Sequence, residues 1–483
     1  MLILVLAAAL GLRLFHLGQR VVWFDEANSL LVARATPAQI IDAAHDDVHS
    51  ALYNLILHFW QSVFTGETVA RMLSVLAAVA TVATVYFLGT RLGGPVAGLL
   101  SAGLLGLSPL HVWYSQEIRM YSGQTLLISL SFLFLLKGMR EGWGNSWRIY
   151  IVCTTLAIYM QYTSIFAILA QNVFVVIRHR KDQRTLRCWL LSQCAVALLF
   201  APCLPLLLWQ TTRVTGRSWI QPLESRQILG FISLFSGAYL GDVRSRAFSI
   251  LVTMAALGVA IVILCRKREN RETACLLTLW FALPILLLLA LSLRQNLFLP
   301  RTLVYMTPAL ALLMGCALAR AEKGIERLAS TLMMVALVSA NLFALRNYYV
   351  SDNPWVKSDL REGANEIAGN FRAGDVIVHS SQFTYRPFQY YLGDQVIQGV
   401  VRQPEKLSHL FAVIGDGHLP QNGADFKRIW LVLYPDFKEQ GFDEKVHKWM
   451  DFHHHFVQVL HSSPTLFIGL YERQGSELAP VIE

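Results

Sequence analysis

An acidic pair, Asp25 and Glu26, directly follows the first apolar segment of the chain. Acidic side chains at the end of a membrane helix are costly unless they face water, and such residues usually serve function. A carboxylate at the membrane–water boundary can accept a proton from an attacking hydroxyl group or orient a sugar. The alternative is a solvated pair in a loop. Because Trp23 and Phe24 place the pair at the interface, we predict that Asp25 and Glu26 are catalytic.

Two further candidates come next in the chain, His49 and Arg71. His49 follows Asp46 and Asp47, so it could orient substrate or exchange a proton near the acidic pair; alternatively, it is an interfacial histidine bonded to a carbonyl. Arg71 opens the second predicted helix. An arginine there either extends to lipid headgroups or binds a phosphate through its planar guanidinium.

Polar side chains also mark the ends of later helices on the same predicted face of the membrane. Glu117 and Arg119 precede the fourth helix, and their spacing of two residues predicts that they point to different sides. Tyr162 lies at a third external turn and Arg301 at a fourth. Each alone is as well explained by solvation, but their gathering on one face predicts a substrate-binding ring of His49, Arg71, Glu117, Arg119, Tyr162 and Arg301.

This set of groups suits the departure of a phosphate from a lipid carrier. A sugar on a polyprenyl phosphate already has a good leaving group, so a strong general acid is unnecessary. The reaction needs cations to hold the developing phosphate charge and a carboxylate to take the proton of the acceptor. External arginines beside an acidic pair fit that division of labour.

The sequence contains no diagnostic cofactor or metal motif. All seven cysteines lie in or beside apolar segments, which predicts neither an external disulfide framework nor a metal site: Cys153, Cys188, Cys194, Cys203, Cys265, Cys275 and Cys316. The run His453–His455 is expected to be a solvated loop. No cofactor is predicted with certainty, and a role for a divalent cation stays open.

The composition indicates that lipid is the solvent for most of the chain. Of the 483 residues, 54% are apolar and 15% are charged, whereas about a quarter are charged in soluble proteins; mean hydropathy is +0.45. Basic cytoplasmic loops and attraction to anionic membrane lipids account for the net charge of +9. Because no nucleic-acid-binding motif is present, nucleic acid is not an expected partner.

Eleven apolar runs are long enough to be predicted as membrane-spanning helices. They cover residues 1–17, 68–92, 94–111, 119–138, 147–162, 163–178, 188–209, 246–265, 273–293, 302–320 and 328–346. The region 147–178 could instead form one long helix. Basic residues favour two helices, because all four lysines before residue 347 then lie on the cytoplasmic side: Lys137, Lys181, Lys267 and Lys323.

We therefore predict a polytopic α-helical membrane protein with about eleven transmembrane helices and a C-terminal extracytoplasmic α/β domain. The N-terminus is cytoplasmic in the cell (inner or plasma) membrane, and the first segment is a retained anchor because it lacks a small-residue cleavage site. The predicted blocks are 1–67, the first helix and a catalytic external loop; 68–346, the helical bundle; and 347–483, the soluble extracytoplasmic domain.

Shorter elements are predicted within these blocks. The first block has amphipathic stretches at 37–46 and 51–64, and the bundle has a long external loop near 210–245. In the last block, strand and helix signals alternate along the chain. Strands are predicted at 376–378, 429–434 and 467–471, and helices near 357–370, 385–392 and 437–450. The residues 352–355 are expected to form the turn into this domain.

The order of the motifs resembles the glycosyltransferase C superfamily, specifically the bacterial relatives of protein O-mannosyltransferases and of lipid A aminoarabinose transferase. The resemblance covers about residues 1–346 and rests on Asp25-Glu26, His49 to Tyr53, Arg71, Ser115 to Tyr121 and Pro300 to Leu310. It implies inverting transfer of a sugar from a polyprenyl-phosphate donor on the external side, with Asp25 as the base. Ser50 and Ala51 replace the two prolines of the family after His49, which makes the backbone there less rigid.

The implied partners are a polyprenyl-phosphate-linked sugar, an acceptor that is a lipid, a glycan or a protein, and membrane lipids. A transporter or flippase of lipid-linked sugars is the alternative, but it would show inverted repeats and acidic residues at mid-membrane, and the sequence shows neither. A sensor or assembly subunit would need fewer spans. The donor sugar, the acceptor, the carrier length, metal dependence and the oligomeric state stay open.

Overall fold

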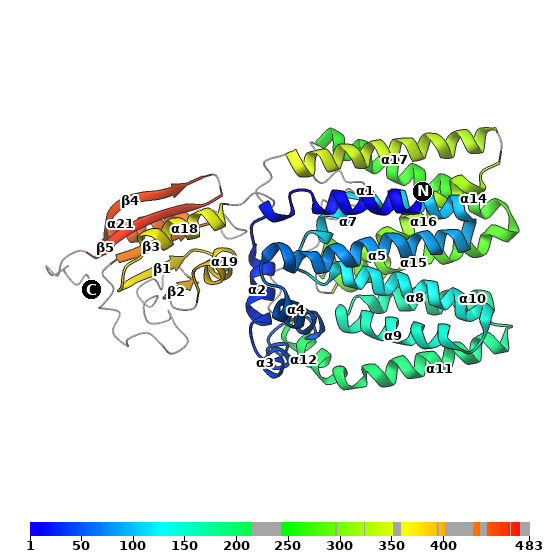
Figure 1. Cartoon of the computed structure of the whole chain (residues 1–483), viewed down its shortest axis with the longest axis horizontal. Helices are drawn as coiled ribbons and strands as arrows, with labels where there is room; N and C mark the ends of the chain where they lie inside the picture. Colours follow the sequence, from blue (N-terminus) through cyan, green and yellow to red (C-terminus); the bar gives the residue numbers. More distant parts are fainter. Residues whose placement is uncertain are drawn as a thin grey trace. The chain divides into compact units, whose positions relative to one another are not determined.

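The computed structural model describes residues 1–214, 243–294, 297–322, 324–350, 359–393, 396–400, 428–434, 442–463 and 465–473 (Figure 1). Most of the predicted loop at 210–245 and the predicted turn at 352–355 lie outside these residues.

The chain divides into two compact units, which are described here one at a time. The helical unit comprises Met1–Gly18 and Ala33–Ser351, and the sheet unit comprises Gln19–Val32 and Asp352–Glu483. The short segment 19–32, which carries the acidic pair, therefore groups with the C-terminal part of the chain.

In the helical unit, helices occupy the apolar runs of the sequence. Its elements are α1 (Leu2–Leu14), α3 (Pro37–Ala43), α4 (Leu52–Val63), α5 (Glu67–Gly93), α6 (Pro95–Gly106), α7 (Pro109–Ser115), α8 (Tyr121–Glu141), α9 (Asn145–Met160), α10 (Ser164–His179), α11 (Gln183–Phe200), α12 (Leu204–Val214), α14 (Val243–Arg266), α15 (Arg271–Ser292), the 3₁₀ helix η5 (Pro300–Met306), α16 (Thr307–Arg320) and α17 (Ile325–Val350). The predicted amphipathic stretches at 37–46 and 51–64 contain α3 and α4.

Judged by helix length and apolarity, the described residues contain fewer candidate membrane spans than the eleven predicted. Among the described residues, eight helices are long and apolar enough to cross a membrane. The pair α6 and α7 would make a ninth, but it is bent by 62°, because Pro109 follows and forces Ser108 into an extended conformation. The region 147–178 forms two helices, α9 and α10, of 16 residues each, and about 24 Å is short for a hydrocarbon core of about 30 Å.

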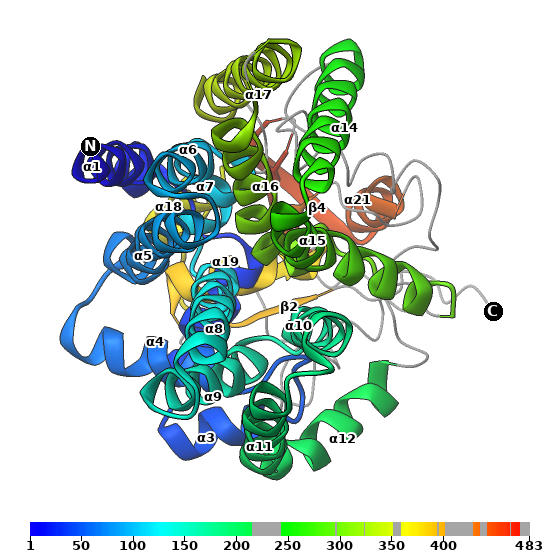
Figure 2. The ribbon, with the colours of Figure 1, turned by 90° about the vertical axis from the view of Figure 1, so that its right-hand side faces the viewer.

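Small residues bring α5, α6 and α16 close together, as the view along the helices shows (Figure 2). A Cβ atom on Gly98 would lie 2.6 Å from the carbonyl oxygen of Tyr86, and one on Gly315 would lie 2.8 Å from the amide nitrogen of Ser101. Such close backbone approach is how membrane helices gain packing energy where lipid offers no hydrophobic driving force. Residues 307–317 of α16 are all buried, so this helix forms the centre of the packing.

The sheet unit contains a five-stranded mixed sheet with the order β2-β1-β3-β5-β4. Its elements are α2 (Phe24–Ala33), whose last residue belongs to the helical unit, α18 (Leu360–Asn370), β1 (Asp375–His379), α19 (Gln382–Leu392), β2 (Gln398–Val400), β3 (Arg428–Leu433), α21 (Phe442–His453), β4 (His454–Ser462) and β5 (Phe467–Arg473). Strand β1 is parallel to β2 and β3, whereas β5 is antiparallel to β3 and β4. A C-terminal α/β domain is thus present, as predicted.

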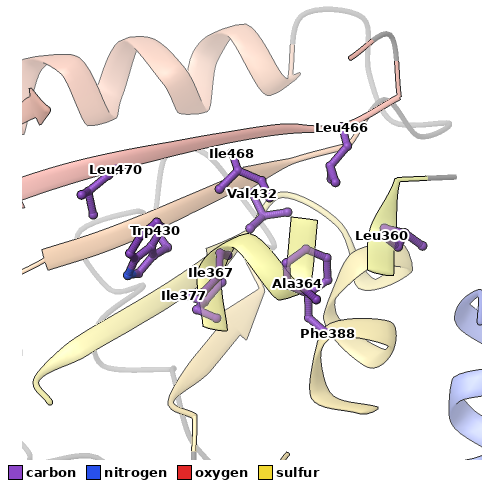
Figure 3. Close-up of a cluster of buried hydrophobic side chains, with 10 residues drawn as sticks. All are labelled: Leu360, Ala364, Ile367, Ile377, Phe388, Trp430, Val432, Leu466, Ile468 and Leu470. Carbon is purple, nitrogen blue, oxygen red and sulfur yellow. The ribbon is translucent and has the colours of Figure 1, made fainter. Parts of the chain in front are cut away.

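Helices cover both faces of this sheet. On one face, Ile377, Trp430 and Ile468 pack against α18 and α19 (Figure 3). On the other face, Val376 and other strand residues pack against Val446 and Met450 of α21. Neighbouring residues of β1 therefore serve opposite faces, as the two-residue period of a strand requires.

Two strands of the sheet escape the sequence-based prediction, and one prediction is wrong. The strand β2 has only three residues, and most side chains of β4 are exposed, so neither shows the continuous apolar run that marks a buried strand. The histidine run is not a loop: His453 ends α21, and His454 and His455 begin β4.

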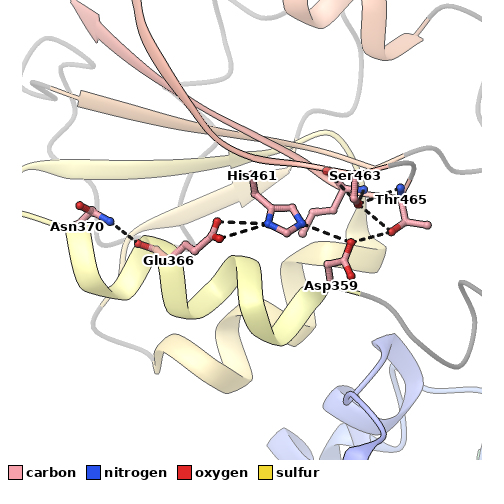
Figure 4. Close-up of polar contacts among 7 residues, drawn as sticks. Asp359, Glu366, Asn370, His461, Ser463 and Thr465 are labelled. Atoms are coloured by element: carbon pink, nitrogen blue, oxygen red, sulfur yellow. Dashed lines mark hydrogen bonds and ion pairs between the residues drawn. The ribbon is translucent and has the colours of Figure 1, made fainter. Parts of the chain in front are cut away.

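Polar contacts hold β4 to the helix α18 (Figure 4). Ring nitrogens of His461 in β4 lie 3.4 Å from a carboxylate oxygen of Asp359 and 3.4 Å from one of Glu366. The hydroxyl group of Thr465 donates to the same Asp359 oxygen over 3.4 Å. An edge strand with exposed side chains is thereby tied to the domain by polar contacts with Asp359 and Glu366.

The buried His379 makes the sheet unit sensitive to acid. Its ring nitrogens lie 2.9 Å from Oγ1 of Thr384 and 3.0 Å from Oε1 of Gln398. Burial lowers the pKa of His379 to about 3, although the contact with Gln398 opposes this. Since an unfolded histidine takes up its proton near pH 6.5, the unfolded state binds more protons between these values, and stability falls as pH falls.

We expect the free energy of unfolding of the sheet unit to fall by about 2 kcal/mol between pH 7 and pH 5, and His379→Gln to remove that dependence. Hydrogen-exchange protection of β1 and β3 in the full-length protein, corrected for intrinsic rates, measures it. His455→Gln is the matched control because His455 is exposed in β4. Equal pH slopes in wild type and His379→Gln would contradict the assignment.

Candidate functional site

The acidic pair lies in the first turn of α2 rather than in a loop. The helix begins at Phe24, and the amide of Ala27 donates to the carbonyl of Trp23 over 2.8 Å. Neighbouring helical residues point about 100° apart, so the two carboxylates have different surroundings. Glu26 is 1% exposed, whereas Asp25 is half-buried. Asp25 is therefore the better placed of the two to meet a substrate.

In the helical unit, Ser74 connects the helix α5, which also carries Arg71, to the turn that carries the predicted residues Glu117 and Arg119. Ser74 lies three residues after Arg71, on the same side of α5, and its hydroxyl donates to the carbonyls of Glu117 over 2.6 Å and of Arg119 over 3.3 Å. Arg71 is fully buried and donates to the carbonyl of Leu17 over 3.4 Å. Ser74 was not among the predicted site residues, and its spacing of three residues from Arg71 was the available signal.

Glu117 and Arg119 lie in the turn between α7 and α8 and not within a helix. Both are largely buried, at 3% and 7% exposed. A carboxylate oxygen of Glu117 accepts from the indole nitrogen of Trp113 over 2.7 Å, and the guanidinium carbon of Arg119 lies 5.9 Å from the centroid of the Tyr121 ring. That the two side chains point to different sides stays a prediction.

His49 and Tyr162 meet at the break between α9 and α10. Nδ1 of His49 lies 3.3 Å from Oε1 of Gln161, and the same oxygen accepts from the amide of Tyr162 over 3.0 Å. Gln210 donates to the carbonyl of His49 over 3.0 Å, which fixes the loop. The hydroxyl of Tyr162 lies 3.6 Å from Sγ of Cys203. Gln161 and Gln210 were not predicted as part of the site.

Arg301 lies in η5, which is bound to the same break. Its neighbour Thr302 offers a carbonyl that accepts from Thr163 over 3.0 Å, and the hydroxyl of Tyr305 donates to the carbonyl of Thr163 over 3.0 Å. Gln124 in the first turn of α8 donates to the hydroxyl of Thr163 over 3.1 Å. Thus Thr163 connects η5 to the start of α8.

These contacts place the predicted ring of the helical unit at one end of its bundle. Arg71, Glu117 and Arg119 form one group around Ser74. His49, Tyr162 and Arg301 form a second group around residues 161–163, and Gln124, in the first turn of α8, donates to Thr163 in this group. Arg71, Arg119 and Arg301 outnumber Glu117 and Glu67, whose carboxylate lies 4.0 Å from Arg71. The balance of these groups is positive, which suits an anionic ligand.

A metal site is not evident in the described residues: no group of three histidine, cysteine or carboxylate side chains is arranged to hold an ion. The cysteines in the described part of the chain are free thiols. The question of a divalent cation therefore stays open.

Comparisons with known proteins bear on the fold and the family. Residues 48–209, roughly a third of the chain, match the family model described as dolichyl-phosphate-mannose-protein mannosyltransferase. No curated protein sequence is significantly similar to the chain.

Solved structures match over nearly the whole length. ArnT from Cupriavidus metallidurans is 13% identical, with a TM-score of 0.62 and a coverage of 97% of both chains. The oligosaccharyltransferase of Archaeoglobus fulgidus is 11% identical, with a TM-score of 0.59 over 98% of this chain and 73% of its own. The arabinofuranosyltransferase AftD from Mycobacteria is 15% identical, with a TM-score of 0.55 over 98% of this chain and 41% of its own.

The resemblance to the glycosyltransferase C superfamily that the motifs indicate is thereby confirmed. Residues 48–209 match the mannosyltransferase family model, and the chain as a whole has the fold of ArnT and of these two transferases.

Proposed function

We propose that the protein is an integral-membrane glycosyltransferase that moves a sugar from a polyprenyl-phosphate donor to a lipid, glycan or protein acceptor. The observation that carries this proposal is that hydrogen bonds connect the segments that bear Arg71, Arg119 and Arg301 in a bundle with this fold. A phosphate that leaves a sugar gains negative charge, and fixed cations stabilise that charge most where water is excluded.

Ligands in structures with a similar fold support this class of donor. ArnT from Cupriavidus metallidurans has a structure with undecaprenyl phosphate, and AglB from Archaeoglobus fulgidus has one with an inhibitory peptide and a dolichol-phosphate. Another structure of the archaeal enzyme carries a tethered acceptor peptide. A lipid phosphate on the donor side, with an open choice of acceptor, fits both this chain and these proteins.

The reaction proceeds as a single displacement. The acceptor hydroxyl oxygen attacks the anomeric carbon, the bond from that carbon to the phosphate oxygen breaks, and polyprenyl phosphate leaves with the electron pair. Asp25 takes the hydroxyl proton as general base. Because the nucleophile enters opposite the leaving group, the configuration inverts. The chemistry takes place on the extracytoplasmic face of the cell membrane. In this topology the N-terminus is cytoplasmic and the C-terminal domain is extracytoplasmic.

The test uses the purified full-length protein in nanodiscs with a panel of radiolabelled polyprenyl-phosphate sugars. We expect one donor to bind and to lose its sugar to added acceptor or slowly to water, and the matching nucleotide sugar to give no product. The absence of binding and turnover with every donor would contradict the proposal. Movement of intact donor across proteoliposome membranes without cleavage would favour a flippase instead.

A further inference from the structure

The segment before the acidic pair is bound to the sheet unit through its backbone. Arg361, in the first turn of α18, donates from Nη2 to the carbonyl of Arg20 over 2.9 Å. Tyr391, in the last turn of α19, accepts the amide of Val22 on its hydroxyl oxygen over 2.9 Å. Arg361 also donates from Nε to the Tyr391 hydroxyl over 3.4 Å. Two residues more than 300 positions away thus hold adjacent peptide groups of this segment.

Apolar packing completes this attachment. Val21 packs against the buried cluster formed by α18, α19 and the sheet, and Val22 is fully buried. The rings of Phe24 and Phe383 lie 5.3 Å apart, edge to face. These contacts make 19–32 part of the compact sheet unit although it lies far from 352–483 in sequence.

The attachment ends where α2 starts. Val22 is the last residue held by Tyr391, Phe24 begins the helix, and Asp25 follows in the first turn. The amide of Ala27 donates to the carbonyl of Trp23, so the first hydrogen-bonded turn of α2 follows directly after the held residues. The contacts that fix residues 20–22 therefore also fix the direction in which the Asp25 side chain leaves the backbone.

We propose that Arg361 and Tyr391 are positioning residues for Asp25, so that the C-terminal domain serves catalysis by holding the base in place. This inference rests on the proposed function, in which Asp25 is the base. A general base must lie within hydrogen-bond reach of the proton that it removes, and an error of about 1 Å can cost about 100-fold in rate. Connecting segments are mobile unless a rigid scaffold positions them, and α18 and α19 are that scaffold.

The first test measures position without using activity. Hydrogen exchange of residues 20–28 is followed in the full-length protein for wild type, Tyr391→Phe and Arg361→Gln. We expect exchange at the Val22 amide to rise about fivefold to tenfold in Tyr391→Phe, because its acceptor is lost. Arg386→Gln is the matched control, since Arg386 lies on α19 and donates to Gln389 within the same helix. Exchange equal to wild type in both test variants would overturn the inference.

The second test asks whether the effect passes through Asp25. We expect Arg361→Gln to lower kcat about tenfold at unchanged KM for the donor, and Arg361→Lys to restore part of it. In the Asp25→Asn background, Arg361→Gln should cause no further loss of single-turnover rate. An equal loss of rate from Arg361→Gln in the wild-type and Asp25→Asn backgrounds would show that Arg361 does not act through Asp25. That result would overturn the proposal and leave Arg361 a structural role. Full turnover by Asp25→Asn would instead overturn Asp25 as the base, and with it this inference, whereas the sugar transfer itself would uphold the proposed transferase.

Discussion

Replacing Asp25 with asparagine is expected to lower the turnover of the proposed donor by 10²–10⁴-fold, because general-base catalysis typically contributes that much. Asparagine keeps the size of the side chain but cannot take a proton at neutral pH. Donor binding should survive, since the arginines that are proposed to hold the phosphate lie elsewhere in the chain. The measurement is sugar transfer in nanodiscs beside equilibrium binding of the same radiolabelled donor.

Two matched variants make the result specific to this carboxylate. Asp42→Asn changes an aspartate whose side chain is 90% exposed, and it should leave turnover unchanged. Glu26→Gln removes the neighbouring carboxylate, which is 1% exposed. If Asp25→Asn turns over like wild type, the base lies elsewhere, and Glu26, His49 and Glu117 are then the candidates to test.

Replacing Asp375 with asparagine is expected to destabilise the sheet unit by about 3–5 kcal/mol, because it breaks a buried ion pair and leaves one charge without its partner. The Asp375 side chain is 1% exposed and that of Arg428 is 11% exposed. Nε and Nη2 of Arg428 donate to the two carboxylate oxygens over 2.9 Å and 2.6 Å, and the indole of Trp430 adds a bond of 2.9 Å. Hydrogen-exchange protection of β1, β3 and β5 in the full-length protein measures the loss.

An exposed ion pair in the same domain is the contrast. Glu444 and Lys448 on α21 lie 2.7 Å apart with side chains that are 68% and 74% exposed. Glu444→Gln should change protection little, since solvent screens exposed pairs and they contribute little to stability. A comparable loss of protection in Asp375→Asn and Glu444→Gln would show that burial is not what makes the Asp375 pair important.

Acid should destabilise the sheet unit as Asp375→Asn does, because protonation also removes the charge of Asp375. Burial raises the pKa of Asp375, but hydrogen bonds from Arg428, Trp430 and the amide of Arg372 outweigh it, so the pKa lies below its ordinary value. A carboxylate with a lowered pKa stabilises the fold above its unfolded pKa of about 3.9, and that stability is lost as pH falls further. The stabilising contribution of Asp375 is therefore lost at a lower pH than the pH range in which the buried His379 already lowers the stability of the unit.

The helices of the bundle could be predicted because their signal is local. A run such as 68–92 must cross a layer about 30 Å thick as a helix, and the structure places α5 at Glu67–Gly93. The polar interruption Gln161-Tyr162-Thr163 similarly marks the break between α9 and α10. The short apolar run Val376-Ile377-Val378, which follows a turn, predicts a strand for the same kind of reason, since neighbouring residues face opposite sides of a sheet.

Elements without such a signal could not be predicted. Most side chains of the strand β4 are exposed, both polar and apolar, and the strand forms because β5 supplies its hydrogen-bond partners. Likewise Ser74 looks like any small polar residue of a membrane helix. Only the approach of the 116–120 turn gives its hydroxyl two carbonyls to bind.

The sequence by itself determined the residue types of the candidate site and the helices that carry them: a carboxylate pair after the first apolar segment, and arginines at helix ends. Only the tertiary structure decided that Asp25 starts a helix, that Glu26 is the buried member of the pair, and that Arg361 and Tyr391 hold the preceding residues. The physical reason is the separation in sequence over which each kind of interaction acts. Hydrophobic periodicity acts between near neighbours in the chain, whereas the backbone of residues 20–22 finds its partners more than 300 positions away, where no local pattern can indicate them.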